Sequence, residues 1–427
     1  MAGISKKKNV VFAFIIAAFI LGVILRWINL NNVSMRSPDE KIYTYQSAVV
    51  INNGVKSVRF LVQEHHKNKE LWAYPPPTRV GYYLPLSFVM KLMGRTNILD
   101  VEVGACMSLF FSVLSILLLI VFGLRFLNPG ITLYSVVFMS VSPMDIAIAR
   151  RTWQDSMAGF LGFLLIYFCC EITANSKRIL WYILFVITGS YYFLVKETSL
   201  LVYGLCMLWV LWVLLKRERD TGKAVKLIAG AVLGAGISMG LLFYLTGGPG
   251  DVLKVLIHIK EGWPFNQYAV NYQSGPWYYF LEGIWIMGPV NMVLFAVGVL
   301  ISLFGKRITL FFKDKDLYAN NGFFVVRDMM VYTLIFTAIA VAMPHCQNIR
   351  YISTVFVPFY LIGGLGFWHI VLYLRKELSK NRCNVMVSVL IIVLFLGAMG
   401  DYFYFKNVFI NPEIPDLSVR YIRENPR

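Results

Sequence analysis

Long apolar runs recur along the whole chain, and they constrain its fold more than any other feature of the sequence. A helix rises about 1.5 Å per residue, so about 20 apolar residues cross the ~30 Å hydrocarbon core of a bilayer. Hydrophobic residues make up 58% of the chain and charged residues only 15%, which excludes a soluble protein of this size. We expect an all-α polytopic membrane protein with about eleven transmembrane helices, near residues 9–29, 104–124, 131–148, 156–173, 179–194, 199–215, 225–245, 279–304, 328–343, 351–374 and 384–404.

One further apolar stretch, Val80–Leu92, is too short to cross a bilayer. We interpret it as a helix lying in the membrane interface, because counting it as a span would reverse the sidedness of every later helix. With eleven spans the clusters of lysine and arginine all fall on one side, as the positive-inside rule requires, with the N-terminus inside and the C-terminus outside. These clusters lie at residues 6–8, 177–178, 216–226, 306–315 and 375–382.

The same topology accounts for most of the excess positive charge, which is 40 Lys and Arg against 23 Asp and Glu. A nucleic-acid-binding protein would interleave basic residues with aromatic ones on a soluble surface, and the sequence has no such pattern. The six cysteines form neither a Cys-x-x-Cys metal pattern nor a disulfide framework. The first apolar run is long for a signal peptide and lacks a small-residue cleavage site, so we expect it to remain as an anchor. We expect residues 1–427 to form one membrane domain, with no separate soluble C-terminal domain.

The first outer loop, residues 30–80, opens with two adjacent carboxylates, Asp39 and Glu40, directly after the first span. An acid at the mouth of an apolar bundle is costly to keep, and it can serve as a catalytic base. This placement makes the pair the first candidate for chemistry in the chain.

The rest of this loop predicts a helix and then a stiff segment. Ile42, Tyr45 and Val49 recur at helical spacing, which indicates an amphipathic helix along the membrane. Three prolines at residues 75–77 stiffen the backbone before the interfacial helix, and we expect them to hold Arg79 near the bilayer surface.

Two arginines, Arg150 and Arg151, lie in a short outer turn, against the positive-inside trend. Asp155 begins the next span, where an acid favours the helix N-terminus. The turn is therefore either a helix cap with basic neighbours, or a site where the arginines neutralise a phosphate while Asp155 supports a second substrate or a metal ion.

The late outer loop, residues 246–278, contains a second candidate interfacial helix. One predicted face carries Val252, Val255, Leu256 and Ile259, and the other carries Lys254 and His258. The loop ends with Trp277 and Tyr278, which suit an aromatic belt at headgroup level or, equally, plain interfacial anchoring.

Two more charged positions lie on the outer side. Lys196 and Glu197 occupy the turn between the fifth and sixth spans, and Arg350 and Tyr351 open the tenth. Each alone could be a snorkelling or capping group. Positive charge repeated in separate loops on the disfavoured side nevertheless indicates a phosphate site at the outer leaflet. Its candidate ligands are Arg79, Arg150, Arg151, Lys196 and Arg350, facing Asp39 and Asp155.

In the order of these motifs the chain resembles the GT-C class of integral-membrane glycosyltransferases, in the branch of protein O-mannosyltransferases and aminoarabinose transferases. The matching series is an Asp-Glu pair after the first span, a proline-rich entry to an apolar interfacial helix, Arg-x-x-x-Asp-Ser before the fourth span, a Lys after the fifth, Pro-Trp-Tyr-Tyr before the eighth and Arg-Tyr in the tenth. The likeness covers nearly the whole chain, although each motif alone is weak.

The resemblance implies an inverting transfer of a sugar from a polyprenyl-phosphate donor on the outer face of the cytoplasmic membrane. It implies that Asp39 is the catalytic base, that Glu40 positions Asp39 or a substrate hydroxyl, and that Asp155 is a second acid. The leaving polyprenyl phosphate is a stable anion, so charge stabilisation matters more than a general acid. Candidate substrate contacts are Tyr82, Glu197, Trp277, Tyr278 and Tyr351.

Three departures leave the acceptor open: Tyr74-Pro75 stands where relatives often have His-Pro, Gly275 stands where a His is common, and only a short tail follows the last span. No cofactor is assigned, and two separated acids leave a divalent metal undecided. A transporter or lipid flippase remains an alternative, although it would predict inverted repeats and mid-membrane charges that the sequence does not show clearly. An O-antigen-type ligase is another, although such enzymes usually place their charges in one late outer loop.

Overall fold

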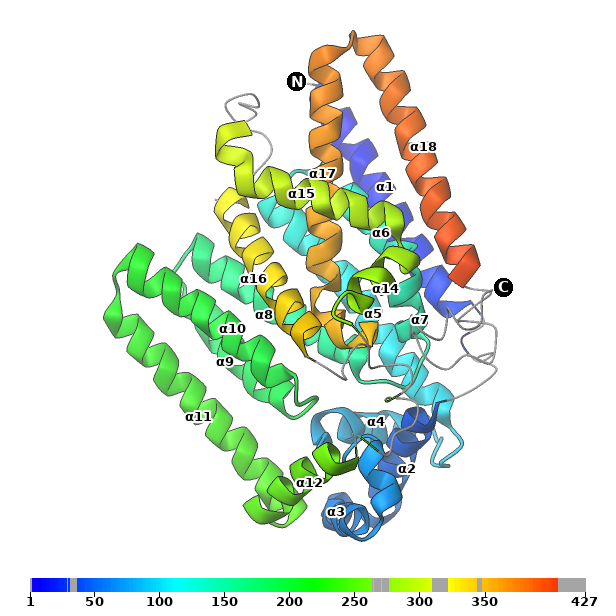
Figure 1. Ribbon diagram of the computed structural model, residues 1–427, viewed down its shortest axis with the longest axis vertical. Helices are drawn as coiled ribbons and strands as arrows, with labels where there is room; N and C mark the ends of the chain where they lie inside the picture. The colour runs from blue at the N-terminus through cyan, green and yellow to red at the C-terminus, as the bar shows by residue number, and fades with distance from the viewer. Residues whose placement is uncertain are drawn as a thin grey trace.

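The computed structural model describes residues 2–28, 30, 37–262, 264, 270, 276–308, 322–343 and 348–405. Within these residues the secondary structure is helical, without β-strands, as the sequence predicts. Figure 1 shows long helices side by side, with a group of shorter helices from the first and late outer loops gathered at one end. The predicted tail, from residue 406 on, lies outside the described residues.

Eight helices of the described part are long and apolar enough to cross a membrane, and a bent pair raises this number to nine. The eight lie at Val10–Trp27, Val101–Phe126, Asp155–Ala174, Ser199–Glu218, Thr221–Thr246, Phe324–Ala342, Arg350–Glu377 and Asn381–Gly400. Two shorter apolar helices, α9 (Ile179–Phe193) and α15 (Pro289–Ile308), match two further predicted spans. The count of eleven stays a prediction.

Two segments expected to be single helices are broken. The predicted span 131–148 consists of α6 (Pro129–Ser140) and α7 (Pro143–Ala149), which meet at 58°. The predicted span 279–304 divides at Gly288 into α14 (Tyr279–Met287) and α15. In both cases a proline opens the second helix; it lacks an N–H donor and disfavours helical geometry in the residue before it.

Among the candidate spans of the described residues, the helix α8 (Asp155–Ala174) is the most deeply buried in the bundle. It packs against α5 (Val101–Phe126), α9 and the short helix η5 (Ile349–Val355). Close approach to η5 depends on glycine: a Cβ at Gly159 would lie 3.1 Å from the carbonyl oxygen of Ser353. The N-terminal part of the central helix thus meets the segment that carries Arg350.

The first outer loop folds into α2 (Pro38–Asn53), η1 (Val55–Ser57), α3 (Val58–Lys67), η2 (Lys69–Ala73) and α4 (Val80–Leu92). The predicted short helix is confirmed with the bounds that its apolar run indicates. The side chains of the predicted apolar face of α2, Ile42, Tyr45 and Val49, are half-buried, whereas Tyr43, Gln46 and Ser47 are buried. Polar side chains line the buried face because they bond to neighbouring segments: Ser47, for example, donates to the carbonyl oxygen of Tyr83 at 3.0 Å.

The helix predicted in the late outer loop is α12 (Pro249–Gly262), and it packs against α3, η2 and α11 (Thr221–Thr246). On its predicted apolar face Val255 is buried and Leu256 is exposed, and His258 on the other face stacks on Trp72 of the first outer loop. Gly262 permits this contact, since a Cβ there would lie 2.6 Å from the backbone of Trp72.

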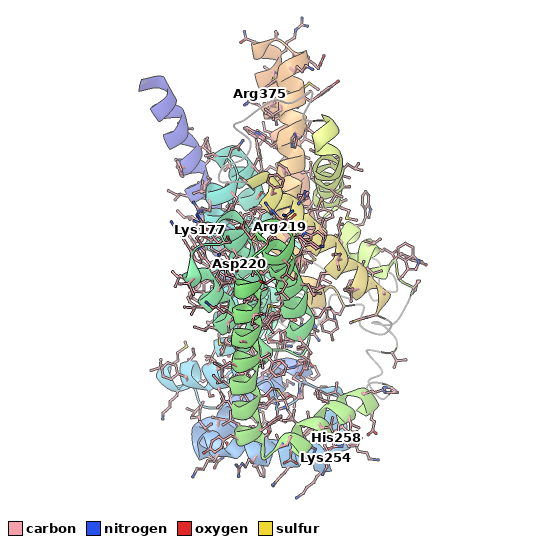
Figure 2. All side chains as sticks on the ribbon, turned by 90° about the vertical axis from the view of Figure 1, so that its left-hand side faces the viewer. Lys177, Arg219, Asp220, Lys254, His258 and Arg375 are labelled. Atoms are coloured by element: carbon pink, nitrogen blue, oxygen red, sulfur yellow. The ribbon has the colours of Figure 1, made fainter. Side chains whose placement is uncertain are left out.

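The opposite end of the bundle carries the positively charged turns. Figure 2 shows Lys177, Arg219 and Arg375 away from the end that carries Lys254 and His258. The sidedness expected from the positive-inside rule stays a prediction.

Candidate functional site

Five segments meet at one end of the bundle and bring most of the predicted charged residues together. They are the start of α2, the proline-rich entry to α4, the turn before α8, the turn between α9 and α10 (Ser199–Trp212), and η5. Instead of a basic rim facing free acids, the structure forms ion pairs between acid and base. These are Asp39–Arg350 at 2.9 Å, Glu40–Arg151 at 3.0 Å, Arg79–Glu197 at 2.8 Å and Asp155–Lys196 at 2.5 Å.

Asp39 lies in the first turn of α2, next to Pro38, and its Oδ2 accepts a hydrogen bond from Nη2 of Arg350. The guanidinium of Arg350 is itself held over the ring of Trp153, 4.6 Å from the centroid, and is 5.5 Å from that of Tyr351. The Asp39 side chain is 23% exposed. It is therefore an oriented carboxylate that solvent still reaches.

Glu40 is fully buried and acts within the structure. Its carboxylate accepts from the backbone N–H of Ser37 at 2.9 Å, which completes a capping box for α2. It also accepts from the backbone N–H of Thr152 at 2.9 Å and from Nη1 of Arg151 at 3.0 Å. Glu40 thus ties the turn before α8 to the first outer loop, which favours a positioning role over contact with a substrate.

Arg79 ends the proline-rich segment and binds Glu197 with two nitrogens, Nε to Oε1 at 3.0 Å and Nη2 to Oε2 at 2.8 Å. Its Nη1 donates to the hydroxyl of Tyr43 at 2.7 Å, and that hydroxyl donates to Gln154. Desolvation works to raise the pKa of Glu197, but the charge and hydrogen bonds of Arg79 lower it overall.

The backbone around Arg79 is fixed by close contact with the α9–α10 turn. The N–H of Gly81 donates to the carbonyl oxygen of Leu194 at 2.8 Å, and a Cβ at Gly81 would lie 2.8 Å from the Leu194 backbone. Tyr191 also donates to the carbonyl oxygen of Gly81, at 2.7 Å. The interfacial helix α4 and the turn that carries Lys196 are thereby one unit.

Asp155 is the first residue of α8, and its partner is the ammonium of Lys196, 41 residues away. The N-cap position is occupied by Gln154 and not by Asp155, and no side-chain capping bond forms there. A helix cap is therefore not a sufficient explanation for Asp155. Lys196 also lies over the ring of Tyr351, 4.8 Å from its centroid. Burial lowers the pKa of Lys196, and the attraction of Asp155 opposes this effect without cancelling it.

Exposure divides the four ion pairs into two groups. We call two of them the sealed pairs, because none of their side chains is more than 4% exposed, and the other two the open pairs, because theirs are 10 to 34% exposed. The sealed pairs are Glu40–Arg151 and Asp155–Lys196, and the open pairs are Asp39–Arg350 and Arg79–Glu197. Arg150, the remaining predicted phosphate ligand, is also buried.

The predicted aromatic contacts differ in position. Tyr82 is fully buried, with its ring centroid 4.7 Å from that of Tyr43, so it packs against a residue that binds Arg79. Tyr351 lies half-buried beneath Arg350 and Lys196. Trp277 and Tyr278 are exposed just before α14, which packs against η5.

A second charged cluster, which the sequence reasoning missed, lies deeper in the bundle. Arg26 of α1 (Ala2–Trp27) is fully buried and pairs with Asp145 of α7. Ser112 joins them, accepting from Nε of Arg26 at 2.7 Å and donating to Asp145 at 2.6 Å. Asp145 and Asp155 line the same small cavity. An arginine and an aspartate inside two predicted spans were the available signal, because buried intramembrane charges are normally paired.

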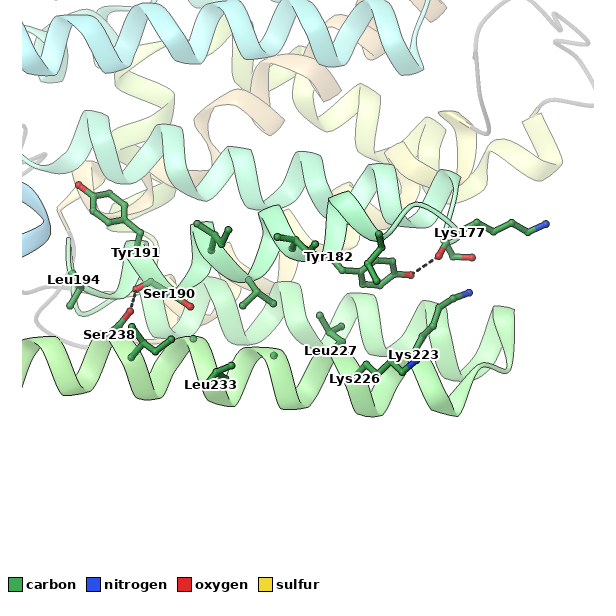
Figure 3. Close-up of a pocket in the computed structure, with 18 residues that line it drawn as sticks. Lys177, Tyr182, Ser190, Tyr191, Leu194, Lys223, Lys226, Leu227, Leu233 and Ser238 are labelled. Carbon is green, nitrogen blue, oxygen red and sulfur yellow. Dashed lines mark hydrogen bonds between the residues drawn. The ribbon is translucent and has the colours of Figure 1, made fainter.

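An apolar groove of about 640 Å³ runs between α9 and α11 (Figure 3). Three lysines, Lys177, Lys223 and Lys226, mark one end of it. Tyr191 and Leu194 mark the other end, which is the end that leads to Lys196. This end of the groove therefore lies two residues before Lys196 along the chain.

No protein-family profile matches the chain, and no curated protein matches it. Solved structures do match. ArnT from Cupriavidus metallidurans bound to undecaprenyl phosphate has a TM-score of 0.59 and 13% identity, over 94% of this chain and 77% of that one; the apo state gives 0.58 and 13%, over 95% and 77%. The Archaeoglobus fulgidus oligosaccharyltransferase complex with Zn and sulfate gives 0.56 and 12%, over 91% of this chain and 53% of that one. These likenesses confirm the expected GT-C-like membrane fold.

Proposed function

We propose that this protein is an inverting glycosyltransferase that moves a sugar from a polyprenyl-phosphate donor to an acceptor on the outer face of the cytoplasmic membrane. The open pair of Asp39 and Arg350 carries the proposal. It places an accessible carboxylate 2.9 Å from a guanidinium, at the end of the bundle where a lipid headgroup would lie. The fold shared with ArnT, which was solved with undecaprenyl phosphate, supports the donor class.

In the proposed reaction Asp39 takes the proton of the acceptor oxygen as that oxygen bonds to the anomeric carbon. The bond from this carbon to the phosphate oxygen breaks on the opposite face, and its electron pair leaves with the polyprenyl phosphate. Negative charge thus disappears at Asp39 while it grows on the phosphate. Arg350, freed from its partner by the same proton transfer, stabilises the growing charge.

The four ion pairs place four cations, Arg79, Arg151, Lys196 and Arg350, around the site. We propose that the positive field of these cations attracts the donor phosphate. Arg79 is the next accessible cation, and its Glu197 partner is the most exposed acid of the cluster. We propose that Arg79 contacts the donor phosphate and Glu197 a sugar hydroxyl, while Lys196 and the buried arginines act through the field.

The groove between α9 and α11 is the proposed path of the polyprenyl tail. Gly230 lines it, and a Cβ there would meet only Val186, at 3.6 Å, so a large side chain fits by filling the groove. Gly230→Trp should raise the KM for a long-chain donor about three- to tenfold, since it displaces about one to two buried prenyl methylene contacts. Gly236→Trp, on the same helix but with open space around it, is the control. Equal KM values in both variants would reject this path.

The alternative of a lipid transporter gains some support from the buried Arg26–Asp145 pair, since such proteins carry paired charges within the membrane. The two functions differ in product, because a transporter relocates a lipid without making a new glycosidic bond. Mass spectrometry of lipids, surface glycans and proteins should be compared in cells that lack the gene and are complemented with wild type or Asp39→Asn. We expect a sugar-bearing product only with wild type. A product of equal abundance with Asp39→Asn would reject Asp39 as the base, and the absence of any sugar-bearing product would reject the transferase.

A further inference from the structure

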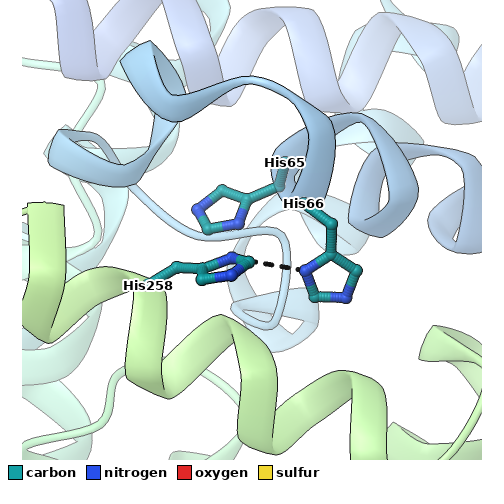
Figure 4. Close-up of side chains that lie close together, drawn as sticks. All are labelled: His65, His66 and His258. Atoms are coloured by element: carbon teal, nitrogen blue, oxygen red, sulfur yellow. Dashed lines mark hydrogen bonds between the residues drawn. The ribbon is translucent and has the colours of Figure 1, made fainter.

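Three histidines from two outer loops converge on one point. His65 and His66 end α3, and His258 lies in the middle of α12. Figure 4 shows the three rings turned toward one another between these helices. One ring nitrogen from each can be chosen so that all three lie within 4.8 Å of one another. Convergence of this kind requires contacts between segments that are about 190 residues apart in the chain.

The distance between two of the rings matches metal coordination. The Nδ1 atoms of His66 and His258 are 3.4 Å apart. Zinc binds imidazole nitrogen at about 2.0–2.1 Å in tetrahedral geometry, which places two ligand nitrogens about 3.3–3.4 Å apart. The separation of these two nitrogens is therefore that of two ligands of one zinc ion.

The third ring is buried and lacks partners. His65 is only 2% exposed, and neither of its ring nitrogens has a hydrogen-bond partner within the described residues. A buried polar group without a partner is costly, so such groups usually face a ligand, an ion or water.

Neighbouring groups hold the rings in place. Trp72 stacks on His258 with ring centroids 4.0 Å apart, and its indole N–H donates to the carbonyl oxygen of His65 at 2.8 Å. Oδ1 of Asp251 lies 3.3 Å from Nε2 of His66, the nitrogen that faces away from His258. A carboxylate on the second nitrogen is the usual companion of a ligating histidine, because it orients the ring and raises its basicity.

We propose that His65, His66 and His258 form a binding site for a divalent transition metal, with zinc as the best match, that fastens the first outer loop to the late one. Three imidazoles select zinc and related ions over calcium or magnesium, which prefer oxygen ligands. The fourth position is open to water or another ligand. The metal would join α3 to α12. Since α2 and α3 belong to the same loop as Asp39, the metal would also restrict the movement of this loop relative to the late outer loop. This inference does not depend on the proposed transferase activity.

The test uses full-length, tag-free protein in detergent, stripped with a chelator and dialysed against Zn²⁺. Bound metal is measured by mass spectrometry, and site geometry is measured from the visible absorption of Co²⁺ in place of zinc. Wild type should retain about one zinc per chain, give the intense bands of tetrahedral Co²⁺, and gain several degrees in Tm with zinc. His66→Phe and His258→Phe keep an aromatic ring at each position, and we expect both to lose the bound metal and the Tm gain.

His369→Phe is the matched control, because it removes a buried histidine of α17 (Phe356–Glu377), far along the chain from the cluster. We expect it to bind zinc as wild type does. The proposal is overturned if the wild-type protein binds no zinc under these conditions. It is also overturned if His66→Phe and His258→Phe bind as much zinc as His369→Phe. Either result would leave the three rings as aromatic packing against Trp72.

Discussion

The sealed and open pairs have the same chemistry and differ in what reaches them. The sealed pairs join backbone segments, as Glu40 does when it binds the N–H groups of Ser37 and Thr152 as well as Arg151. The open pairs leave charged atoms at the surface of the site, where a substrate can exchange with the partner. The comparison teaches that a conspicuous charge in the sequence can be a tie between loops, and that exposure separates such charges from those that a substrate can reach.

Breaking a sealed pair should produce the largest loss of stability. Glu40→Ala leaves Arg151 buried without its partner and removes two acceptors for backbone N–H groups, so we expect a loss of about 3–5 kcal/mol in the free energy of unfolding. Thermal and denaturant unfolding in detergent measures it. Glu70→Ala, at an exposed position of the same loop, should change stability little. Equal stability of the two variants would remove the distinction between sealed and open pairs.

Breaking an open pair should instead reduce turnover while the fold stays stable. Arg350→Gln removes the donor that faces Asp39 and the departing phosphate, so we expect kcat to fall about 10²–10³-fold. Arg350→Lys should fall less, since it keeps the charge but loses the planar geometry. Arg95→Gln, at an arginine whose side chain is 67% exposed, is the control. A variant of Arg350 that is unstable but catalytically normal once folded would place this pair among the structural ones.

Lys196 tests the boundary between the groups, because it is sealed yet contributes to the proposed positive field. An ordinary lysine has a pKa of about 10.4. Burial lowers the pKa of Lys196, so this residue loses its charge at a lower pH than an ordinary lysine does. Loss of a cation weakens phosphate binding, so donor affinity should fall a few-fold as the pH rises toward that value. Lys196→Arg keeps its charge and should remove this decrease. The same pH profile in both proteins would show that Lys196 does not contribute to donor binding.

Local patterns were sufficient to predict some elements and not others. The helix Val80–Leu92 follows three prolines and coincides with one short, mainly apolar run, so its bounds were readable. The pairing of Asp39 with Arg350 joins residues 311 positions apart, and no local pattern carries such information. The sequence therefore placed the charged residues on one rim but not the partner of each.

Burial that arises from tertiary contact is not readable from local sequence. On α12 the helical spacing separates His258 from the apolar face, and Trp72 and the first-loop histidines make its side an interface. On α2 the buried face is polar because its side chains bond to neighbouring backbone, as Gln46 does to the carbonyl oxygen of Pro75. Periodicity detects apolar burial and misses burial through hydrogen bonds.

The central claim is that Asp39 performs chemistry instead of holding structure or binding the donor. It is tested most directly by measuring donor affinity, turnover and Tm together in purified wild type and Asp39→Asn. Asparagine keeps the shape and can still meet Arg350, but it cannot accept the proton. We predict a Tm within a few degrees of wild type, donor affinity within a few-fold, and turnover reduced about 10²–10⁴-fold. Turnover that falls only in proportion to donor affinity, or that does not fall, would contradict the account.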